Sequence, residues 1–242
     1  MKVAILYLWP QDNAAEFEPY ANQWAQSFKA NDSGFAYDLH VCACGPRANY
    51  SRPHWLPYRT SVHHYEGGGY DIGAQQFSAK KIDADLLVTG TARHYYWKPG
   101  WLARIVEAFQ QYGDGLYAAG TSLEKCPLGC KDFPNPHIRT ANYAMTPERF
   151  RRYPFLIDNR EKGYLFESGE WNIARWFWDS GLPVVQVCWD GFYPNRDSWR
   201  NVRNSFRKGD QSNLLVRDKH TDNFDAQDPR TKLEWRKRAW GE

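Results

Sequence analysis

Two carboxylates three residues apart, Glu167 and Glu170, stand before an aromatic stretch that is typical of a helix. A positioned carboxylate can act as a general base that takes the proton of a hydroxyl nucleophile, an effect of ~10²- to 10⁴-fold on rate. Acids are also common in the first turn of a helix, where the helix dipole stabilises negative charge. Residue type and spacing therefore leave two interpretations open, base chemistry or an ordinary helix start.

Five cysteines offer a second kind of chemistry, but their spacing favours free thiols. Cys126, Cys130 and His137 could supply three zinc ligands, although the three-residue gap and the missing fourth ligand argue against a zinc site. We therefore predict a loop with two free thiols there, and core positions for Cys42 and Cys188 in strand-like runs. An odd number of cysteines in a chain of this length fits a reducing compartment better than a disulfide framework.

Basic residues cluster near the end of the chain and alternate with Trp235 and Trp240, a composition that can bind nucleic acid. The basic residues are Arg200, Arg203, Arg207, Lys208, Arg230, Lys232, Arg236, Lys237 and Arg238. The acids that balance them are Asp210, Asp218, Asp222, Asp225 and Asp228. This balance favours a solvated tail. The net charge of +3 demands no polyanionic partner and is compatible with a phosphorylated ligand.

A fold must position these residues, and the hydrophobic pattern predicts an α/β protein with a mostly parallel central sheet flanked by helices. Strands are expected at residues 2–9, 37–43, 61–66, 85–89, 115–120 and 184–189. Helices are expected at residues 12–30, 70–80, 100–111, 145–153 and 170–180. Ligands bind outside the carboxyl ends of the strands in such a sheet, so the segments after Trp9, Ala43 and Thr89 should line the site.

The pattern divides the chain into a domain over residues 1–195 and a polar extension over residues 196–242, packed on or near the active site. The first ten residues show no signal peptide, and no later run approaches the ~20 apolar residues of a membrane-spanning helix. We therefore expect a cytoplasmic protein. Aromatic residues make up 17% of the chain, which suggests surfaces that hold flat rings or sugars.

Two segments resemble the GT-A glycosyltransferases. Residues 73–102, GAQQFSAKKIDADLLVTGTARHYYWKPGWL, are similar to the helix, buried strand, donor-binding loop and following helix of that family. Residues 166–181, FESGEWNIARWFWDSG, are similar to the acidic motif and helix of its inverting members. With the first strand these matches span residues 1–191, and residues 206–222 resemble the tails of bacterial and phage members.

The resemblance implies a single GT-A-like domain that transfers a sugar from a nucleotide-sugar donor to a hydroxyl acceptor, with inversion. Counting back from Gly181, it assigns Glu170 as the catalytic base and Asn172 to the position of an acid. Glu167 is the substitute base or an orienting group. The acceptor side is expected near residues 137–150.

The chain departs from the family where a metal would bind. Most members carry an Asp-x-Asp motif that holds Mg²⁺ or Mn²⁺ through oxygen ligands. This chain has instead the run Thr89, Gly90, Thr91 and Ala92. Asp83 and Asp85 precede the strand and are interpreted as a turn.

The need for a divalent metal therefore stays open. His220 and Asp190 are the candidate ligands if a metal binds. Without a metal, the positive charge that a leaving diphosphate needs could come from Arg93, His94 or Lys98.

The remaining site residues are assigned by their places in the predicted sheet and in the resemblance. The expected donor-binding residues are Leu8, Trp9, Pro10, Asp71, Thr89, Gly90, Thr91 and Arg93. The expected acceptor-binding residues are Trp189, Asp190, His137 and Arg139.

Two other functions stay open. The chain could glycosylate a hydroxymethylated base in DNA, as some phage enzymes do, with the base extruded from the stack. It could also be a non-catalytic sugar or nucleotide binder, because a fold does not fix a function. A nucleotidyltransferase is disfavoured, since Trp9, Pro10 and Gln11 stand where a glycine-rich basic loop would follow the first strand.

Overall fold

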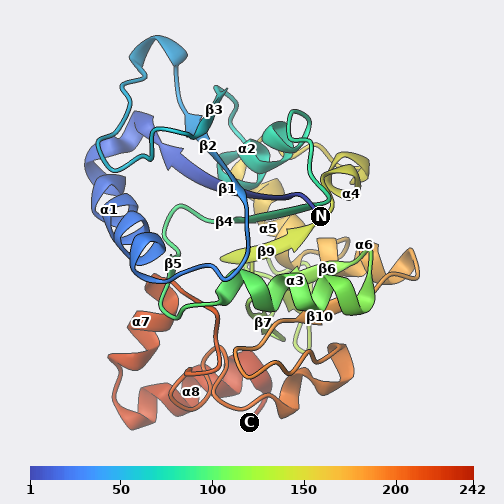
Figure 1. The fold of residues 1–242 in the computed structure, drawn as a ribbon. Helices are drawn as coiled ribbons and strands as arrows, with labels where there is room; N and C mark the ends of the chain where they lie inside the picture. The colour runs from blue at the N-terminus through green and yellow to red at the C-terminus, as the bar shows by residue number, and fades with distance from the viewer.

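The computed structural model describes residues 1–242 and places seven strands in one central sheet (Figure 1). The strands lie in the order β10-β6-β9-β4-β1-β2-β3, and every neighbouring pair is parallel except the pairs that involve β9. Their bounds are Val3–Pro10 (β1), Asp38–Cys44 (β2), Ser61–Tyr65 (β3), Leu86–Gly90 (β4), Leu116–Ala118 (β6), Asn142–Met145 (β9) and Val184–Gln186 (β10). The predicted class, an α/β domain with a mostly parallel sheet, is confirmed.

The strand β1 is apolar on both faces because helices cover both sides of the sheet. Its residues alternate between two core clusters, with Leu6 and Leu8 on one face and Ile5 and Tyr7 on the other. The continuous apolar run of this strand follows from burial on both sides rather than on one.

Helices form a layer on each face of the sheet (Figure 1). The helices α1 (Ala14–Ala30) and α3 (Trp101–Tyr112) contribute Trp24 and Ile105 to one cluster. The other face is covered by α2 (Tyr70–Ala79), α4 (Pro147–Arg152), α5 (Arg160–Ser168) and α6 (Ile173–Asp179).

Much of the aromatic content serves the core. Tyr7 stacks on Trp24 with ring centroids 4.1 Å apart, and Tyr96 stacks on Trp101 at 3.6 Å. All of the largest fully buried side chains are aromatic. The sequence suggested aromatic surfaces for ligands, whereas packing accounts for most of these rings.

The C-terminal segment packs onto the rest of the domain. It contains η3 (Arg196–Asn201), β11 (Val216–Arg217), α7 (Lys219–Asp225) and α8 (Pro229–Trp240), and β11 pairs with β5 (Tyr95–Tyr96). Trp199 and Trp240 are fully buried in the same cluster as Leu6, and the indole of Trp240 donates to the carbonyl of Phe206 at 2.7 Å. The segment therefore belongs to the core of the domain.

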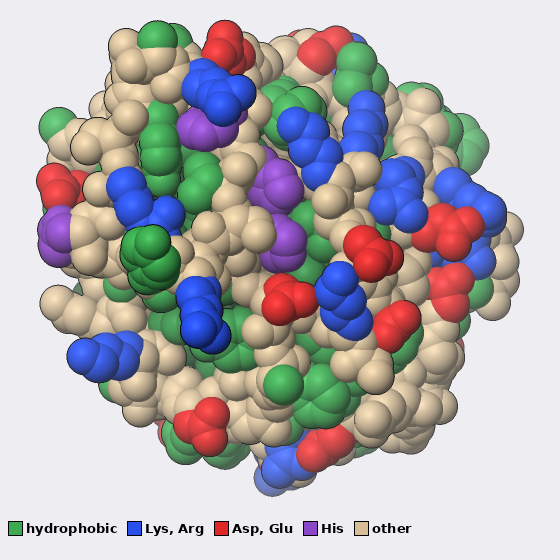
Figure 2. Space-filling model, turned by 45° about the horizontal axis from the view of Figure 1, so that its top comes forward, with side chains coloured by type: hydrophobic (Ala, Val, Ile, Leu, Met, Phe, Trp, Pro, Cys, Tyr) green, Lys and Arg blue, Asp and Glu red, His purple; other side chains and the backbone are tan.

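Ion pairs occupy several basic side chains of this segment. The pairs are Arg207–Glu124, Lys208–Glu242, Arg217–Asp222, Arg217–Asp225, Arg230–Glu234 and Arg236–Glu242. On the face drawn in Figure 2, Lys and Arg side chains are interspersed with Asp and Glu side chains.

Several elements differ from the sequence expectation. The strand β9 was not expected, and the helix expected at residues 145–153 is the short α4. The helix expected at residues 170–180 begins at Ile173, because Asn172 caps it by accepting from the Arg175 amide at 3.0 Å. None of the helices combines the length and the apolar character that crossing a membrane requires.

A pair of histidines links β2 to β3. His40 Nδ1 lies 3.1 Å from His63 Nε2, and the two rings stack with centroids 5.3 Å apart. Burial lowers the pKa of His63 to about 4, with further lowering by His40 and Lys81. The pair is therefore neutral near pH 7.

We expect this pair to weaken the fold in acid. As the pH falls below about 6.5, the unfolded chain binds a proton at His63, whereas the folded chain does so only near pH 4. The free energy of unfolding should fall across this window by less than the ~1.4 kcal/mol per pH unit of a fully buried group, because solvent screens the half-buried ring. Urea titrations at pH 7 and pH 5 check this, because His63→Gln should lose less stability than the wild type. The exposed His54→Gln is the matched control, and equal losses in both variants would contradict the assignment.

Candidate functional site

The parallel strands end along one edge of the sheet, which we call the carboxyl edge. Its members are the ends of β1, β2 and β4 at Pro10, Cys44 and Gly90, and β9 starts beside them at Asn142. The Cys42 thiol and burial raise the pKa of the Cys44 thiol. The charges of Asp71 and Asp12 raise it further, so both carboxylates lie near this thiol. The edge thus brings the loop after β1 and the start of α2 together.

The end of β4 is tightly packed. The Gly90 carbonyl accepts from Gln75 Nε2 at 2.9 Å, and a Cβ on Gly90 would lie 2.1 Å from the Ala141 carbonyl oxygen. The Thr91 amide donates to that same carbonyl at 3.2 Å. The Thr89 side chain is buried, and its hydroxyl donates to the Leu6 carbonyl at 3.3 Å. With no carboxylate among these side chains, the end of β4 does not fit a divalent cation.

Arg93 follows this turn and is held by aromatic side chains of α1. Its guanidinium lies 4.4 Å from the ring centroid of Phe17 and 5.3 Å from that of Tyr20, and it forms an ion pair with Glu16. Its Nε atom is buried without a hydrogen-bond partner. The Nε–H group of Arg93 is therefore unpaired within the protein.

The other two expected charge donors, His94 and Lys98, make contacts of their own. His94 is buried, its Nδ1 contacts the Thr91 carbonyl at 2.5 Å, and burial lowers its pKa to about 4, so it is neutral near pH 7. The Lys98 ammonium donates to the Ser212 carbonyl. Of the three expected charge donors, Arg93 is the one whose charge acts on Asp71.

A run of three glycines fixes the start of α2. A Cβ on Gly69 would lie 2.0 Å from the Ile157 carbonyl oxygen, and one on Gly68 would lie 2.8 Å from that of Asp158. The Tyr65 hydroxyl accepts a hydrogen bond from the Gly69 amide at 3.1 Å. The next residue, Tyr70, has a φ of 48° and is 65% exposed. A bulky residue in the left-handed region is strained, and such strain is common at functional sites.

Asp71 lies in the first turn of α2, and its carboxylate makes no hydrogen bond with the protein. Burial raises its pKa to about 6, Arg93 opposes that shift, and Glu167 adds to it. A carboxyl group that titrates near neutral pH beside another carboxylate is a candidate for binding or acid–base chemistry.

Glu167 lies in the last turn of α5, partly buried, and Thr140 Oγ1 donates to its Oε2 at 2.6 Å. A negative charge there opposes the helix dipole, so the interpretation as a helix-start acid does not apply to Glu167. Glu170 lies in the exposed turn between α5 and α6. The two glutamates therefore have different surroundings, although only two residues separate them.

His137 and Arg139 continue the polar row beyond Glu167. His137 is buried in β8 (His137–Ile138), its Nδ1 contacts the Asn135 carbonyl at 2.7 Å, and burial lowers its pKa while Glu167 opposes that shift. Arg139 lies 3.7 Å from the ring centroid of Phe206 and donates to Asp218 at 2.9 Å. Of these two expected acceptor residues, Arg139 contacts the C-terminal segment.

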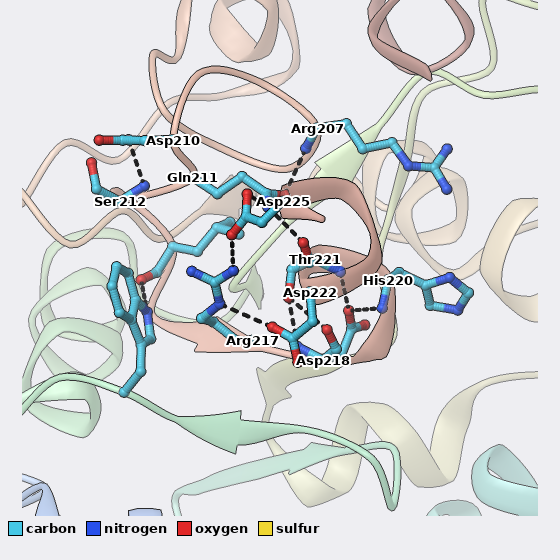
Figure 3. A network of polar contacts seen from close by, with 12 residues as sticks. Arg207, Asp210, Gln211, Ser212, Arg217, Asp218, His220, Thr221, Asp222 and Asp225 are labelled. Atoms are coloured by element: carbon cyan, nitrogen blue, oxygen red, sulfur yellow. Dashed lines mark hydrogen bonds and ion pairs between the residues drawn. The ribbon is translucent and has the colours of Figure 1, made fainter. Parts of the chain in front are cut away.

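Asp218 organises this part of the C-terminal segment (Figure 3). It caps α7 by accepting from the amides of His220 at 2.9 Å and Thr221 at 3.0 Å. In Figure 3 the side chains of His220 and Arg207 point to the same side of this network, and Arg207 pairs with Glu124. Burial lowers the pKa of His220, and Arg139 and Arg207 lower it further.

The other expected residues lie apart from this row. Leu8 and Trp9 are buried in the core, so Pro10 is the accessible residue at the end of β1. The Lys98 ammonium lies 5.0 Å from the ring centroid of Trp189. Asp190 accepts a hydrogen bond from Asn213 Nδ2 at 2.9 Å. No group of three His, Cys, Asp or Glu side chains is arranged to hold a metal ion, and no contact joins His220 to Asp190.

Sequence reasoning missed two site features, Tyr70 and the pair Thr140–Glu167. The Gly67–Gly69 run signalled a turn, but the positive φ of Tyr70 depends on contacts with residues 157 and 158. The bond from Thr140 to Glu167 joins two segments that are distant in sequence. A separate groove of about 510 Å³ runs along β10 between Tyr112, Trp178 and Phe192 and contains none of the expected site residues.

No protein-family model and no curated protein matches the chain. Solved structures with a similar fold include S. aureus TarS 1–349, at 11% identity over 69% of this chain and 54% of that chain, with a TM-score of 0.44. Galactosyltransferase LgtC, in complex with donor and acceptor sugar analogues, gives 13% identity over 68% of this chain and 64% of that chain, with a TM-score of 0.42. HddC from Yersinia pseudotuberculosis gives 10% identity over 66% and 81%, also at 0.42. These similarities concern the fold alone, so the chemistry of the site is drawn from this chain's own residues.

Proposed function

We propose that this chain is a glycosyltransferase that uses a nucleotide-sugar donor and a hydroxyl acceptor, with Glu167 as the general base. One observation carries the proposal: the charges of Arg93 and Glu167 both act on the Asp71 carboxyl, so the three side chains lie near one another at the carboxyl edge. Sugar transfer needs a base for the acceptor, an acceptor of hydrogen bonds from the sugar hydroxyls, and positive charge for the diphosphate. This group supplies all three.

The donor is assigned to the side of the site formed by Pro10, Tyr70, Asp71 and Arg93. The carboxylate of Asp71 has no partner in the protein and can accept hydrogen bonds from sugar hydroxyls. The exposed ring of Tyr70 offers a flat face to the base or the sugar. Arg93, whose side chain is partly exposed and whose charge acts on Asp71, supplies positive charge for the diphosphate.

The acceptor is assigned to the side of Glu167, His137 and Arg139. Thr140 holds one oxygen of Glu167, which leaves the second oxygen for the acceptor hydroxyl. The acceptor oxygen forms a bond to the anomeric carbon while the bond from that carbon to the diphosphate oxygen breaks. The proton passes to Glu167, and the electron pair of the broken bond stays on the diphosphate. Attack from the side opposite the diphosphate inverts the anomeric carbon.

Glu167→Gln should lower the rate of transfer by ~10²- to 10⁴-fold, because glutamine cannot take the proton. The donor is found first by a thermal-shift screen of nucleotide sugars, since a bound donor raises the stability by mass action. Donor binding should be unchanged in Glu167→Gln, which separates a lost base from a damaged site.

Glu170→Gln is the matched control, because it makes the same substitution on a nearby glutamate that lies in an exposed turn. It should change the rate by less than ~10-fold. A large loss in Glu170→Gln with an active Glu167→Gln would give the role of base to Glu170. Full activity in both variants, or no donor that binds, would overturn the proposed function.

Asp71→Asn should stabilise the fold while it weakens donor binding. The folded pKa of about 6 lies above the usual value, so the stability contributed by the protonated carboxyl is lost as the pH rises through 6. At pH 7.5 the substitution should raise the free energy of unfolding by about 1–2 kcal/mol, and this gain should vanish near pH 4. Denaturant titrations at both pH values measure the gain, and the exposed Asp12→Asn at the same edge should show none.

Tyr70→Gly should also separate stability from binding. Glycine adopts a positive φ freely, so the loss of strain offsets the ~0.5–1 kcal/mol that glycine costs in the unfolded state. Its melting temperature should stay at or above that of the wild type, while donor affinity falls on the order of 10-fold through loss of the ring. Tyr58→Gly, at a 93% exposed position, is the control and should leave donor affinity unchanged. Unchanged affinity in Tyr70→Gly would remove Tyr70 from the donor site.

A further inference from the structure

The loop between β7 (Thr121–Ser122) and β8 holds two thiols in contact. Cys130 Sγ lies 3.0 Å from Cys126 Sγ, with Cys126 buried and Cys130 exposed. All five cysteines of the chain are in the thiol form. No step of the proposed transfer uses either of these two residues.

The backbone of the loop holds the two thiols in this position. The Cys126 amide donates to the Lys131 carbonyl at 2.8 Å, and the Gly129 amide donates to the Cys126 carbonyl at 2.9 Å. Gly129 has a φ of 72°, which a residue with a side chain adopts at a cost. This tight turn brings the two ends of the Cys126–Cys130 segment together, so a bond between the sulfurs requires little backbone movement.

The other three cysteines lack this turn, although the thiols of Cys42 and Cys44 also interact with each other. Cys42 and Cys44 lie within β2, where Cys44 Sγ points at the Cys42 carbonyl at 3.7 Å. Cys188 is buried just after β10. They are therefore internal controls in the same molecule.

We propose that Cys126 and Cys130 form a reversible disulfide by exchange with a low-molecular-weight disulfide such as oxidised glutathione. The exposed Cys130 thiolate attacks one sulfur of glutathione disulfide, forms a mixed disulfide and releases one glutathione thiolate. Cys126, as a thiolate after loss of its proton, then attacks Cys130 Sγ and releases the second glutathione. The protein dithiol is oxidised by two electrons, and glutathione disulfide is reduced to two thiols.

The oxidised loop would border the proposed active site. Asn135 Nδ2 donates to the Ser168 carbonyl at 2.8 Å, next to Glu167, and the Glu170 amide faces the Cys130 thiol. Burial and the neighbouring Cys126 thiol raise the pKa of Cys130, so the exchange should accelerate as the pH rises.

The test incubates the native protein with oxidised glutathione and then alkylates the remaining thiols after denaturation. The wild type should lose two of its five free thiols, and peptide mass spectrometry should place a loss of two hydrogen atoms between Cys126 and Cys130. Dithiothreitol should restore all five thiols. Cys130→Ser, at an exposed position, should retain its four thiols, and Cys42→Ser should still lose two.

Four results would overturn the proposal. One is the survival of all five thiols at pH 8, where thiolates are available. The second is a loss that falls on Cys42, Cys44 or Cys188. The third is a glutathione adduct that persists on Cys130, which would show that Cys126 cannot reach it. Closure that occurs only in urea would equally assign the disulfide to the unfolded chain.

Discussion

The close approach of residue 141 to Gly90 is the constraint on which the carboxyl edge depends. The strand β9 runs antiparallel between β4 and β6, and the Ala141 carbonyl occupies the space where a side chain on residue 90 would lie. A glycine is required at this point for a steric reason rather than for flexibility. The same approach carries Arg139 and Thr140 to the edge, where they contact Asp218 and Glu167.

The charged side chains at this edge differ in whether another side chain neutralises them. Arg139 is neutralised by a carboxylate that also caps α7, so its charge mainly holds the C-terminal segment. Asp71 has no such partner, and its desolvation is an energetic cost that folding alone does not require. Proteins tolerate such costs where a ligand recovers them. Arg139 therefore serves the structure, whereas Asp71 is the group left for a ligand.

The parts of the fold that the sequence predicts are those with strong local patterns. The strands β1, β2 and β4 and the helices α1 and α3 follow from apolar runs and helical periodicity. The strand β9 is four residues long and contains a buried asparagine, so only its pairing partners define it. The helix α5 has the polar sequence REKGYLFES with an internal glycine, and tertiary packing of Phe166 overrides its weak propensity.

The same distinction applies to the site. Counting residues back from Gly181 located the acidic segment, but the true end of α5 at Ser168 decides which face each glutamate occupies. Pattern alone placed Trp9 at the ligand, whereas the packing of Trp9 against Trp55, with centroids 5.4 Å apart, holds it in the core. Asp71 and Arg93 were expected at the donor for their places at strand ends, and their mutual influence appears only once the chain is folded.

Burial of Trp240 in the cluster that contains Leu6 and Leu8 also shapes how the chain acquires its structure. The helix that carries Trp240 closes on much earlier parts of the chain, since the Leu123 amide donates to the Ala239 carbonyl at 2.9 Å and the Trp240 indole donates to the Phe206 carbonyl at 2.7 Å. Contacts this distant in sequence are slow to form and leave apolar surface exposed in the meantime. The nascent chain must therefore persist in a partly open state until residue 240 emerges, and that interval is when association with other chains is most damaging.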